Sequence, residues 1–233
     1  MTRGVLDGAF ALLEALDGRE LRPSELAKYC GLPKTTTHRM LDQLVALGAV
    51  ERAGEHYRIG HTLFRLGATW TPAGRLSAAA RAAARGLAAT RSDCTVGLVA
   101  FSDSRTIVVN TLHGERFPGG FPSPGTIVPA GMEPDLVRAA FAPDTDPPDG
   151  YTTTEWRRLV WAVRARDGVV TTGQYFGDLG LSVAGAPVRD RSGTAIGAIG
   201  IVVHGHTPVH KLEPLVLRAA RLTSGTLARS VSR

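Results

Sequence analysis

The stretch from Gly31 to Gly48 constrains the fold of this chain more than any other. Both glycines can end a helix in the left-handed conformation, and Pro33 suits a helix start because its missing N–H needs no partner there. The residues between them therefore predict one short helix. At about 100° per residue, one side should pack inward, and it consists of Thr37, Met40, Leu41, Leu44 and Gly48.

The opposite side of this predicted helix is polar. Thr35, Arg39 and Gln43 share it, and Thr36 lies beside them. Hydroxyl, guanidinium and amide groups on one exposed face suit the phosphates and base edges of a DNA major groove. An ordinary solvated helix face is the alternative, and the neighbouring segments decide between the two.

Two further helices precede this stretch. Residues 5–16 are amphipathic, with an apolar stripe made of Val5, Ala9, Phe10, Leu12, Leu13 and Leu16. Residues 23–30 form the second, with Leu26, Ala27 and Cys30 facing inward and Gly31 ending it. Two short helices joined by such a tight turn are typical of helix-turn-helix domains.

A small hairpin should follow, with strands at 49–52 and 57–60 around the turn Ala53-Gly54-Glu55-His56. A hairpin directly after a recognition helix is a wing, which can lie against the DNA backbone or in a minor groove. We therefore predict a winged helix-turn-helix domain. Its candidate DNA contacts are Lys34, Thr35, Thr36, His38, Arg39, Gln43, Arg52, His56 and Arg58.

Composition agrees with an anionic partner. The net charge is +6 and the pI about 9.9. All but three of the 27 basic residues are arginine, so a genome rich in G and C is a competing explanation. Cys30 and Cys94 are far apart and fit small buried thiols in a reduced cytosol. No apolar run is long enough to span a bilayer and no secretion signal is evident, so we expect a soluble, cytoplasmic protein without membrane contact.

The middle of the chain predicts a linker. Residues 61–70 form a helical stretch, and Thr71-Pro72-Ala73-Gly74 should break it, which places a domain boundary near 71–75. Residues 75–90 are mostly alanine and predict another helix. Its arginines, with Arg91 after it, are expected to form a solvated face rather than a phosphate site.

The second part predicts an antiparallel sheet flanked by helices, which gives the whole chain an α+β fold class. Strands are expected at 94–101, 106–113, 169–175, 181–188 and 194–203. Helices are expected at 132–141, at 208–231, and from a capping box at Thr152 and Glu155 to near Gly168. Residues 114–131 predict a loop or an irregular edge strand, and residues 142–150 an exposed connection. This architecture commonly holds a small-molecule pocket on one face of the sheet.

Enzymatic chemistry has little support. His204, His206 and His210 could suggest a metal, but no nearby cysteine or carboxylate completes a site. Ser182 and Asp178 have no histidine at a suggestive spacing, and no nucleophile elbow is present. Gly197 and Gly200 fit a strand rather than a phosphate loop. We expect no catalytic residues, no cofactor and no metal.

With these motifs in place, the chain resembles the IclR family (isocitrate lyase regulator type) of bacterial transcription regulators. The resemblance covers nearly the whole chain and rests on segments in family order: Ser24-Glu25-Leu26-Ala27, residues 31–41, Tyr57-Arg58-Ile59-Gly60, Leu66-Gly67-Ala68 and Ala186-Pro187-Val188-Arg189-Asp190. It implies a winged helix-turn-helix domain at 1–60, a linker helix at 61–75 and a GAF-like effector-binding and oligomerisation domain at 76–233. It also implies homodimers, often dimers of dimers, on palindromic operators in double-stranded DNA.

Several positions depart from the family pattern. Ala130-Gly131-Met132-Glu133 stands where the family usually has a His-Ala-Thr type motif, and Val183, Gly173 and Gly200 replace polar pocket residues. We therefore expect a pocket lined near Thr126, Met132, Val183 and Gly200 that takes a larger, less polar effector than a small carboxylate. Two alternatives remain open: a DNA-binding regulator with a degenerate sensor, and a metal-binding or enzymatic GAF-like protein.

Overall fold

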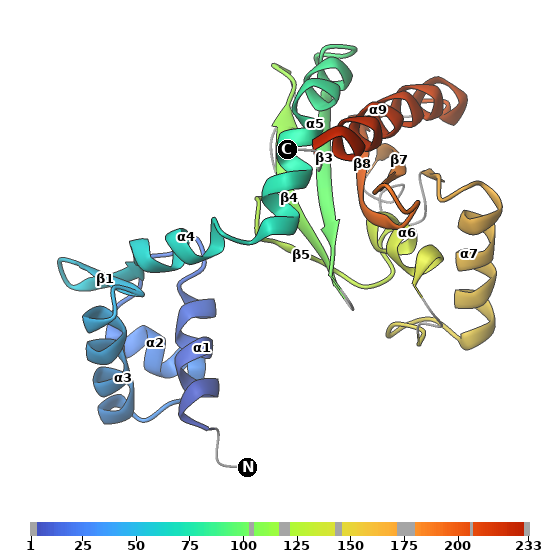
Figure 1. Ribbon diagram of the computed structural model, residues 1–233. Helices are drawn as coiled ribbons and strands as arrows, with labels where there is room; N and C mark the ends of the chain where they lie inside the picture. Colours follow the sequence, from blue (N-terminus) through green and yellow to red (C-terminus); the bar gives the residue numbers. More distant parts are fainter. Residues whose placement is uncertain are drawn as a thin grey trace. The chain divides into compact units, whose positions relative to one another are not determined.

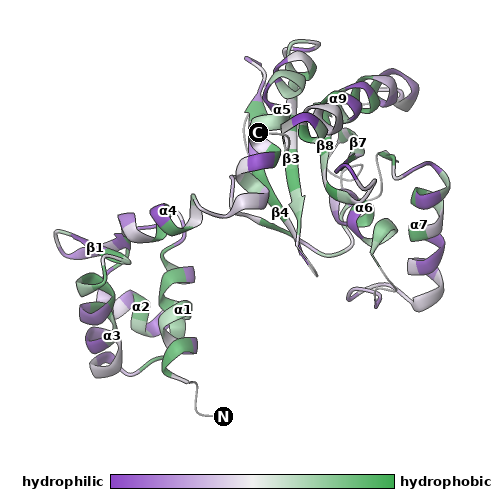
Figure 2. Cartoon of the chain, viewed as in Figure 1, coloured by the Kyte–Doolittle hydropathy of each residue, from purple (hydrophilic) through white to green (hydrophobic). Residues whose placement is uncertain are grey.

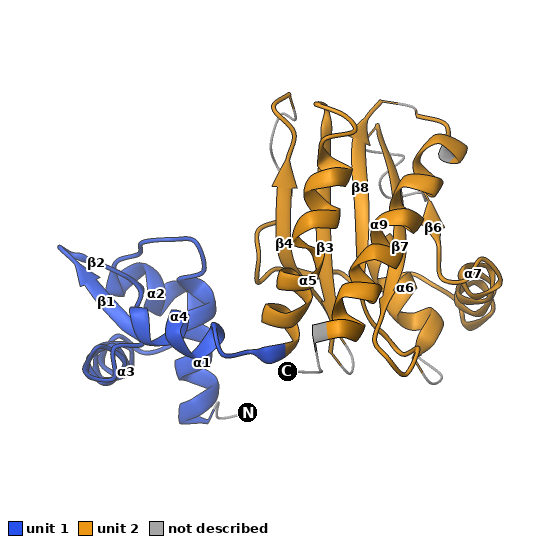
Figure 3. Cartoon of the chain, turned by 45° about the horizontal axis from the view of Figure 1, so that its top comes forward, with its two compact units in different colours: residues 1–71 blue, residues 72–233 orange. Residues whose placement is uncertain are grey.

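The structure, a computed structural model, describes residues 4–102, 105–116, 122–142, 146–171, 180–205 and 207–230. The chain divides into two compact units, residues 1–71 and 72–233 (Figure 1 and Figure 3). Some positions singled out in the sequence lie outside the described residues. They are Gly173, Asp178 and His206, together with most of the predicted 169–175 strand.

The first unit is a helix-turn-helix fold with a hairpin. Its elements are α1 (Val5–Ala15), α2 (Pro23–Cys30), α3 (Lys34–Ala46), β1 (Val50–Ala53), β2 (His56–Ile59) and α4 (His61–Gly67). Gly31 has a φ of 64° and ends α2 in the left-handed conformation, and Pro33 is the N-cap of α3. The winged helix-turn-helix predicted from the sequence is confirmed.

The core of this unit joins its three first helices to the hairpin. Leu12, Leu26, Leu41 and Val50 are almost fully buried within it. The turn from α3 into β1 brings backbones very close, because a side chain on Gly60 would collide with the carbonyl oxygen of Gly48.

The predicted apolar stripe of α1 is partly wrong. Leu12 and Leu16 are buried as expected, but Val5 and Phe10 are 61% and 64% exposed. The helix packs through the side that carries Gly8, where the Met40 side chain lies so close that an added Cβ would meet it at 2.9 Å. Figure 2 shows that α1 remains largely hydrophobic, so apolar side chains are left on its outer surface.

The second unit is built on an antiparallel sheet of order β5-β4-β3-β8-β7-β6. Its strands are β3 (Cys94–Phe101), β4 (Thr106–His113), β5 (Ile127–Val128), β6 (Val170–Thr171), β7 (Leu181–Arg189) and β8 (Ala195–His204). Its helices are α5 (Thr71–Ala88), α6 (Glu133–Phe141), α7 (Thr153–Ala165) and α9 (Val209–Ser230). The predicted α+β class and the predicted antiparallel sheet are confirmed.

Helices cover both faces of this sheet. In Figure 3, α5 and α9 lie side by side across one face. Helix α6 packs on the other face, where Val137 and Ala140 join a core with Val99 of β3 and Ala198 of β8. Helix α7 packs on α6 through Trp156 and Val160. The predicted capping box starts α7, since the Thr152 N–H donates to Glu155 at 2.9 Å.

The predicted helix break at residues 71–74 is wrong. Helix α5 begins at Thr71, and the interruption falls at residues 68–70 instead. Pro72 is tolerated because it lies in the first turn of the helix, where a backbone N–H has no intrahelical partner.

Strand β4 changes face halfway along. Leu98 of β3 pairs with Asn110, whereas the next residue, Val99, pairs with Val108, so Val109 is an extra residue in β4. This bulge directs Thr106 and Val108 toward α6, and Asn110 with Leu112 toward α5. One strand thus contributes side chains to both faces of the sheet.

Candidate functional site

Helix α3 is held by one buried side. Thr37, Met40, Leu41 and Leu44 are buried, as the helical spacing predicts. The Thr37 hydroxyl donates to the Pro33 carbonyl oxygen at 3.1 Å, so this polar residue is fully buried without an unsatisfied group. These contacts fix which side of α3 faces outward.

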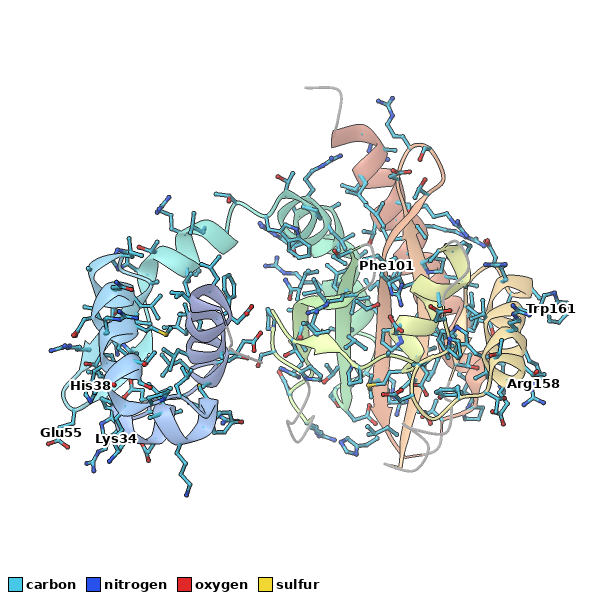
Figure 4. All side chains as sticks on the ribbon, turned by 90° about the horizontal axis from the view of Figure 1, so that it is seen from below. Lys34, His38, Glu55, Phe101, Arg158 and Trp161 are labelled. Atoms are coloured by element: carbon cyan, nitrogen blue, oxygen red, sulfur yellow. The ribbon has the colours of Figure 1, made fainter. Side chains whose placement is uncertain are left out.

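The outward side of α3 carries the predicted DNA contacts. Lys34, Thr35, His38, Arg39 and Gln43 are exposed, and Thr36 is half-buried. Within the described part of the chain, none of these six side chains makes a hydrogen bond or an ion pair. Figure 4 shows Lys34 and His38 projecting from the unit, and Figure 2 shows hydrophilic residues along α3. Their donors are available to a ligand outside the chain.

The wing differs from α3 because its arginines already have carboxylate partners. The Arg52 guanidinium contacts Asp42 of α3 at 2.6 Å and lies over the Tyr57 ring. Arg52 therefore ties the hairpin to the recognition helix. The pair is more than half exposed on both sides, so its net stabilisation is small and DNA could displace it.

Arg58 and Glu51 connect the wing to α4. The Arg58 guanidinium lies 3.3 Å from Glu51 and 3.6 Å from Glu20. Glu51 also accepts hydrogen bonds from the backbone N–H and the ring of His61, the first residue of α4, both at 3.1 Å. These contacts hold the pKa of Glu51 below its ordinary value of 4.5, and the hydrogen bonds from His61 have the largest effect. The sequence did not indicate this carboxylate, because its partners lie on separate elements.

The second unit contains a cavity of about 70 Å³ between the sheet and α6. Thr126, Met132, Val183 and Gly200, the four residues that the sequence suggested, all line it. Among the described residues its other side chains are apolar, except that of Glu133, which is buried. The apolar side chains that line the cavity include Val99, Val108, Val128, Val137, Val170 and Val202.

A row of glycines crosses the sheet beside this cavity. Gly97 of β3 pairs with Gly200 of β8, which in turn pairs with Gly185 of β7. All three border the cavity, so bare backbone replaces side chains along the row. The sequence carried a visible signal for this feature, a glycine inside each of three predicted strands, but the strand register was needed to align them.

A buried ion pair fixes the loop that borders the cavity. Asp135 contacts Arg138 at 2.8 Å, accepts from the Thr106 hydroxyl at 2.8 Å and accepts from the backbone N–H of Gly131 at 3.1 Å. Gly131 has a φ of 84°, which favours glycine. Asp135 thereby joins β4, the cavity loop and α6. Sequence reasoning missed it because an acid in a first helical turn has an ordinary local explanation.

The structure also bears on the sequence predictions about metal sites, cysteines and membrane spans. Within the described residues, no group of three His, Cys, Asp or Glu side chains could hold a metal ion. Cys30 and Cys94 are buried, as expected, and form no disulfide, and burial raises the pKa of Cys94. No helix in the described ranges has the length and apolar character that crossing a membrane requires.

The fold and the exposed face of α3 define a class: a DNA-binding regulator with a winged helix-turn-helix domain and a separate α+β domain. Residues 5–54 match the IclR helix-turn-helix domain. The first unit therefore carries an IclR-type helix-turn-helix domain, and the chain is an IclR-type DNA-binding regulator.

Similar proteins cover almost the whole chain. It is 28% identical over 247 aligned positions to the glycerol operon regulatory protein of Streptomyces griseus, covering 98% of this chain and 94% of that protein. An IclR homologue from Microbacterium hydrocarbonoxydans, solved with 4-hydroxybenzoate, has a TM-score of 0.81 at 21% identity, covering 96% of this chain and 99% of the other. Pseudomonas aeruginosa HmgR has a TM-score of 0.72 at 22% identity, with 96% and 97% covered. At these identities the structures establish the shared fold.

Proposed function

We propose that this chain is a ligand-responsive transcription regulator that binds a palindromic operator as a homodimer. The observation that carries the proposal is the outward side of α3, a polar surface with unused donors on a helix fixed by its buried side. The proposed contacts to DNA come from α3 and the wing. They are Lys34, Thr35, Thr36, His38, Arg39, Gln43, Arg52, His56 and Arg58.

The two groups of contacts have different roles in this proposal. Arg39 lies mid-face on α3 and can reach a guanine with a bidentate guanidinium. Arg52 and Arg58 lie on the wing and exchange their carboxylate partners for phosphates when DNA binds. Base readout then rests on α3, and the wing supplies position and salt dependence.

Dimerisation follows from the limited reach of one recognition helix, which reads only a few base pairs. The first unit exposes large apolar side chains on two helices. They are Val5, Leu6 and Phe10 on α1, and Phe64 and Leu66 on α4. We assign this apolar surface to a second copy of the chain, because exposed apolar patches of this kind mark interaction sites.

The cavity in the second unit is the proposed effector site. Its apolar lining suits a ligand bound mainly by burial, at roughly 25 cal/mol per Å² before ordering costs. The described lining contains no Lys, Arg or His side chain, so an anionic effector would be buried there without a counter-charge, which is costly. The Microbacterium homologue, solved with 4-hydroxybenzoate, supports small-molecule binding by this fold. We therefore propose a neutral, mainly apolar effector here.

A degenerate sensor is the second candidate, and the cavity size favours it. About 70 Å³ is less than the roughly 150 Å³ that holds a benzene ring in an apolar protein cavity. On this alternative the chain binds DNA in the same way whether or not metabolites are present.

Thermal unfolding of the full chain separates the two candidates. Indole and benzyl alcohol serve as neutral apolar probes, and glyoxylate and pyruvate as small acids. If the chain is a ligand-responsive regulator, a neutral probe should raise its Tm. At a probe concentration 100 times the probe's Kd, binding should stabilise the folded chain by about 2.7 kcal/mol. Val183→Met, which fills the cavity, should abolish the shift, and the distant Trp161→Ala should retain it. A degenerate sensor shows no shift with any probe, and tight pyruvate binding lost in Val183→Met refutes the proposed chemistry.

A further inference from the structure

A second hollow lies on the opposite side of the sheet from the cavity. It is a groove of about 150 Å³ between α5 and strands β3 and β4. Ser77, Arg81 and Arg85 of α5 form one wall at helical spacing of four residues, so they follow one another along one face. Val96 and Leu98 of β3 form part of an apolar floor.

The bulge in β4 completes the polar wall. Because Val109 is an extra residue, Asn110 points to the α5 side of the sheet, while Val108 lines the cavity on the other side. Bulges often redirect a side chain next to a functional site. Here the bulge places an amide opposite the two guanidinium groups of Arg81 and Arg85.

The polar groups of this groove are unused. Within the described residues, the side chains of Ser77, Arg81, Arg85 and Asn110 make no hydrogen bond, and neither arginine makes an ion pair. Two cations one helical turn apart also repel each other, which disfavours the helix. An anion between the two guanidinium groups would relieve that repulsion and accept their hydrogen bonds.

We propose that the groove binds a small organic acid, with its carboxylate on Arg81 and Arg85 and a compact apolar body against the floor. Guanidinium groups match carboxylates in two-point geometry, and Asn110 and Ser77 can add further hydrogen bonds. The volume equals that of an apolar cavity that holds a six-membered carbon ring. This site is independent of the proposed effector cavity, which lies on the other sheet face and has no basic side chain in its described lining.

The apolar floor distinguishes this ligand from a phosphate of DNA. Val96 and Leu98 are already buried, so the accessible apolar part of the floor is the half-buried Leu112 side chain, which a phosphate held by the two arginines would leave uncovered. A carboxylate with an apolar body satisfies both halves of the groove. A DNA contact is therefore treated as a competing outcome of the test.

Calorimetry on the full chain with benzoate tests the proposal, and benzamide is the neutral analogue of the same shape. We expect benzoate to bind at least tenfold more tightly than benzamide. The double variant Arg81→Gln with Arg85→Gln should weaken benzoate binding at least tenfold. Asn110→Leu should also weaken benzoate binding, but by a smaller factor. Arg75→Gln, on an exposed arginine of the same helix outside the groove, should leave binding unchanged.

Two results would overturn the proposal. Benzoate binding that persists in the double arginine variant but is lost in Val183→Met would place the acid in the other cavity. If the wild-type chain does not bind benzoate, and the double variant binds DNA more weakly with a smaller dependence of its DNA affinity on salt concentration, the arginines contact phosphates instead. Both arginines are exposed, so the variants should fold, and an unchanged Tm without ligand checks this.

Discussion

Arg39 is the residue on which sequence readout should depend most. It is exposed at the middle of the outward side of α3 and is not engaged by any other described side chain, unlike Arg52 and Arg58. We predict that Arg39→Ala loses about 1–3 kcal/mol of discrimination between operator and random DNA. Gel-shift titrations on both DNAs measure the ratio. Arg39→Lys, which keeps the charge, should retain nonspecific affinity but not specificity, and an unchanged ratio in both variants would contradict the assignment.

Asp135 is a residue whose importance only the structure reveals. Its partner Thr106 is distant in sequence, so no local pattern could predict the pair. We predict that Asp135→Asn lowers the free energy of unfolding by about 3 kcal/mol or more, because it leaves the Arg138 charge buried without its counter-charge.

Asp167→Asn is the matched control for that prediction. Asp167 pairs with Arg189 at 2.7 Å, but its side chain is 84% exposed, so the change should cost about 1 kcal/mol or less. Asparagine also tolerates the positive φ of this position. Urea unfolding measures both variants, and equal losses would refute the special role of the buried pair.

Among the elements, those with clear end signals could be predicted well. Gly31 at the end of α2 and the capping box at Thr152 both fix boundaries through local backbone chemistry, which a sequence displays directly. The start of α5 was misjudged, because Pro72 and Gly74 are tolerated in a first helical turn as well as in a loop.

The face that α1 buries could not be predicted in full. Its apolar residues surround more than one side of the helix, and the contact between Gly8 and Met40 selects which side packs inward. Val5 and Phe10 are left exposed as a consequence. These two exposed residues, which the predicted stripe had placed inside, belong to the candidate dimer interface.

That candidate interface gives the prediction for assembly. Phe10→Asp combined with Phe64→Asp should convert a dimer into a monomer at micromolar concentration, because two charges would have to be buried against a second copy. Light scattering measures the change. Trp161→Asp, at an equally exposed aromatic on α7 in the other unit, should remain dimeric. A wild-type monomer that binds its operator tightly would refute the dimer.

For the whole molecule, the fold class and the cavity-lining residues could be anticipated, whereas the arrangement around the sheet could not. Thr126, Met132, Val183 and Gly200 line one cavity, and the resemblance to a family indicated them. The alignment of Gly97, Gly200 and Gly185 depends on strand register, and the split of β4 between two faces depends on a bulge. Neither has a local sequence signature.

A footprint of the purified protein on the DNA that flanks its own gene tests operator-specific binding most directly. We expect protection of a palindrome whose half-sites are about one helical turn, roughly 10 base pairs, or a multiple of it apart. Arg39→Ala should lose this protection at equal protein concentration. Protection that is absent, or uniform along the DNA, from folded protein would contradict an operator-specific regulator.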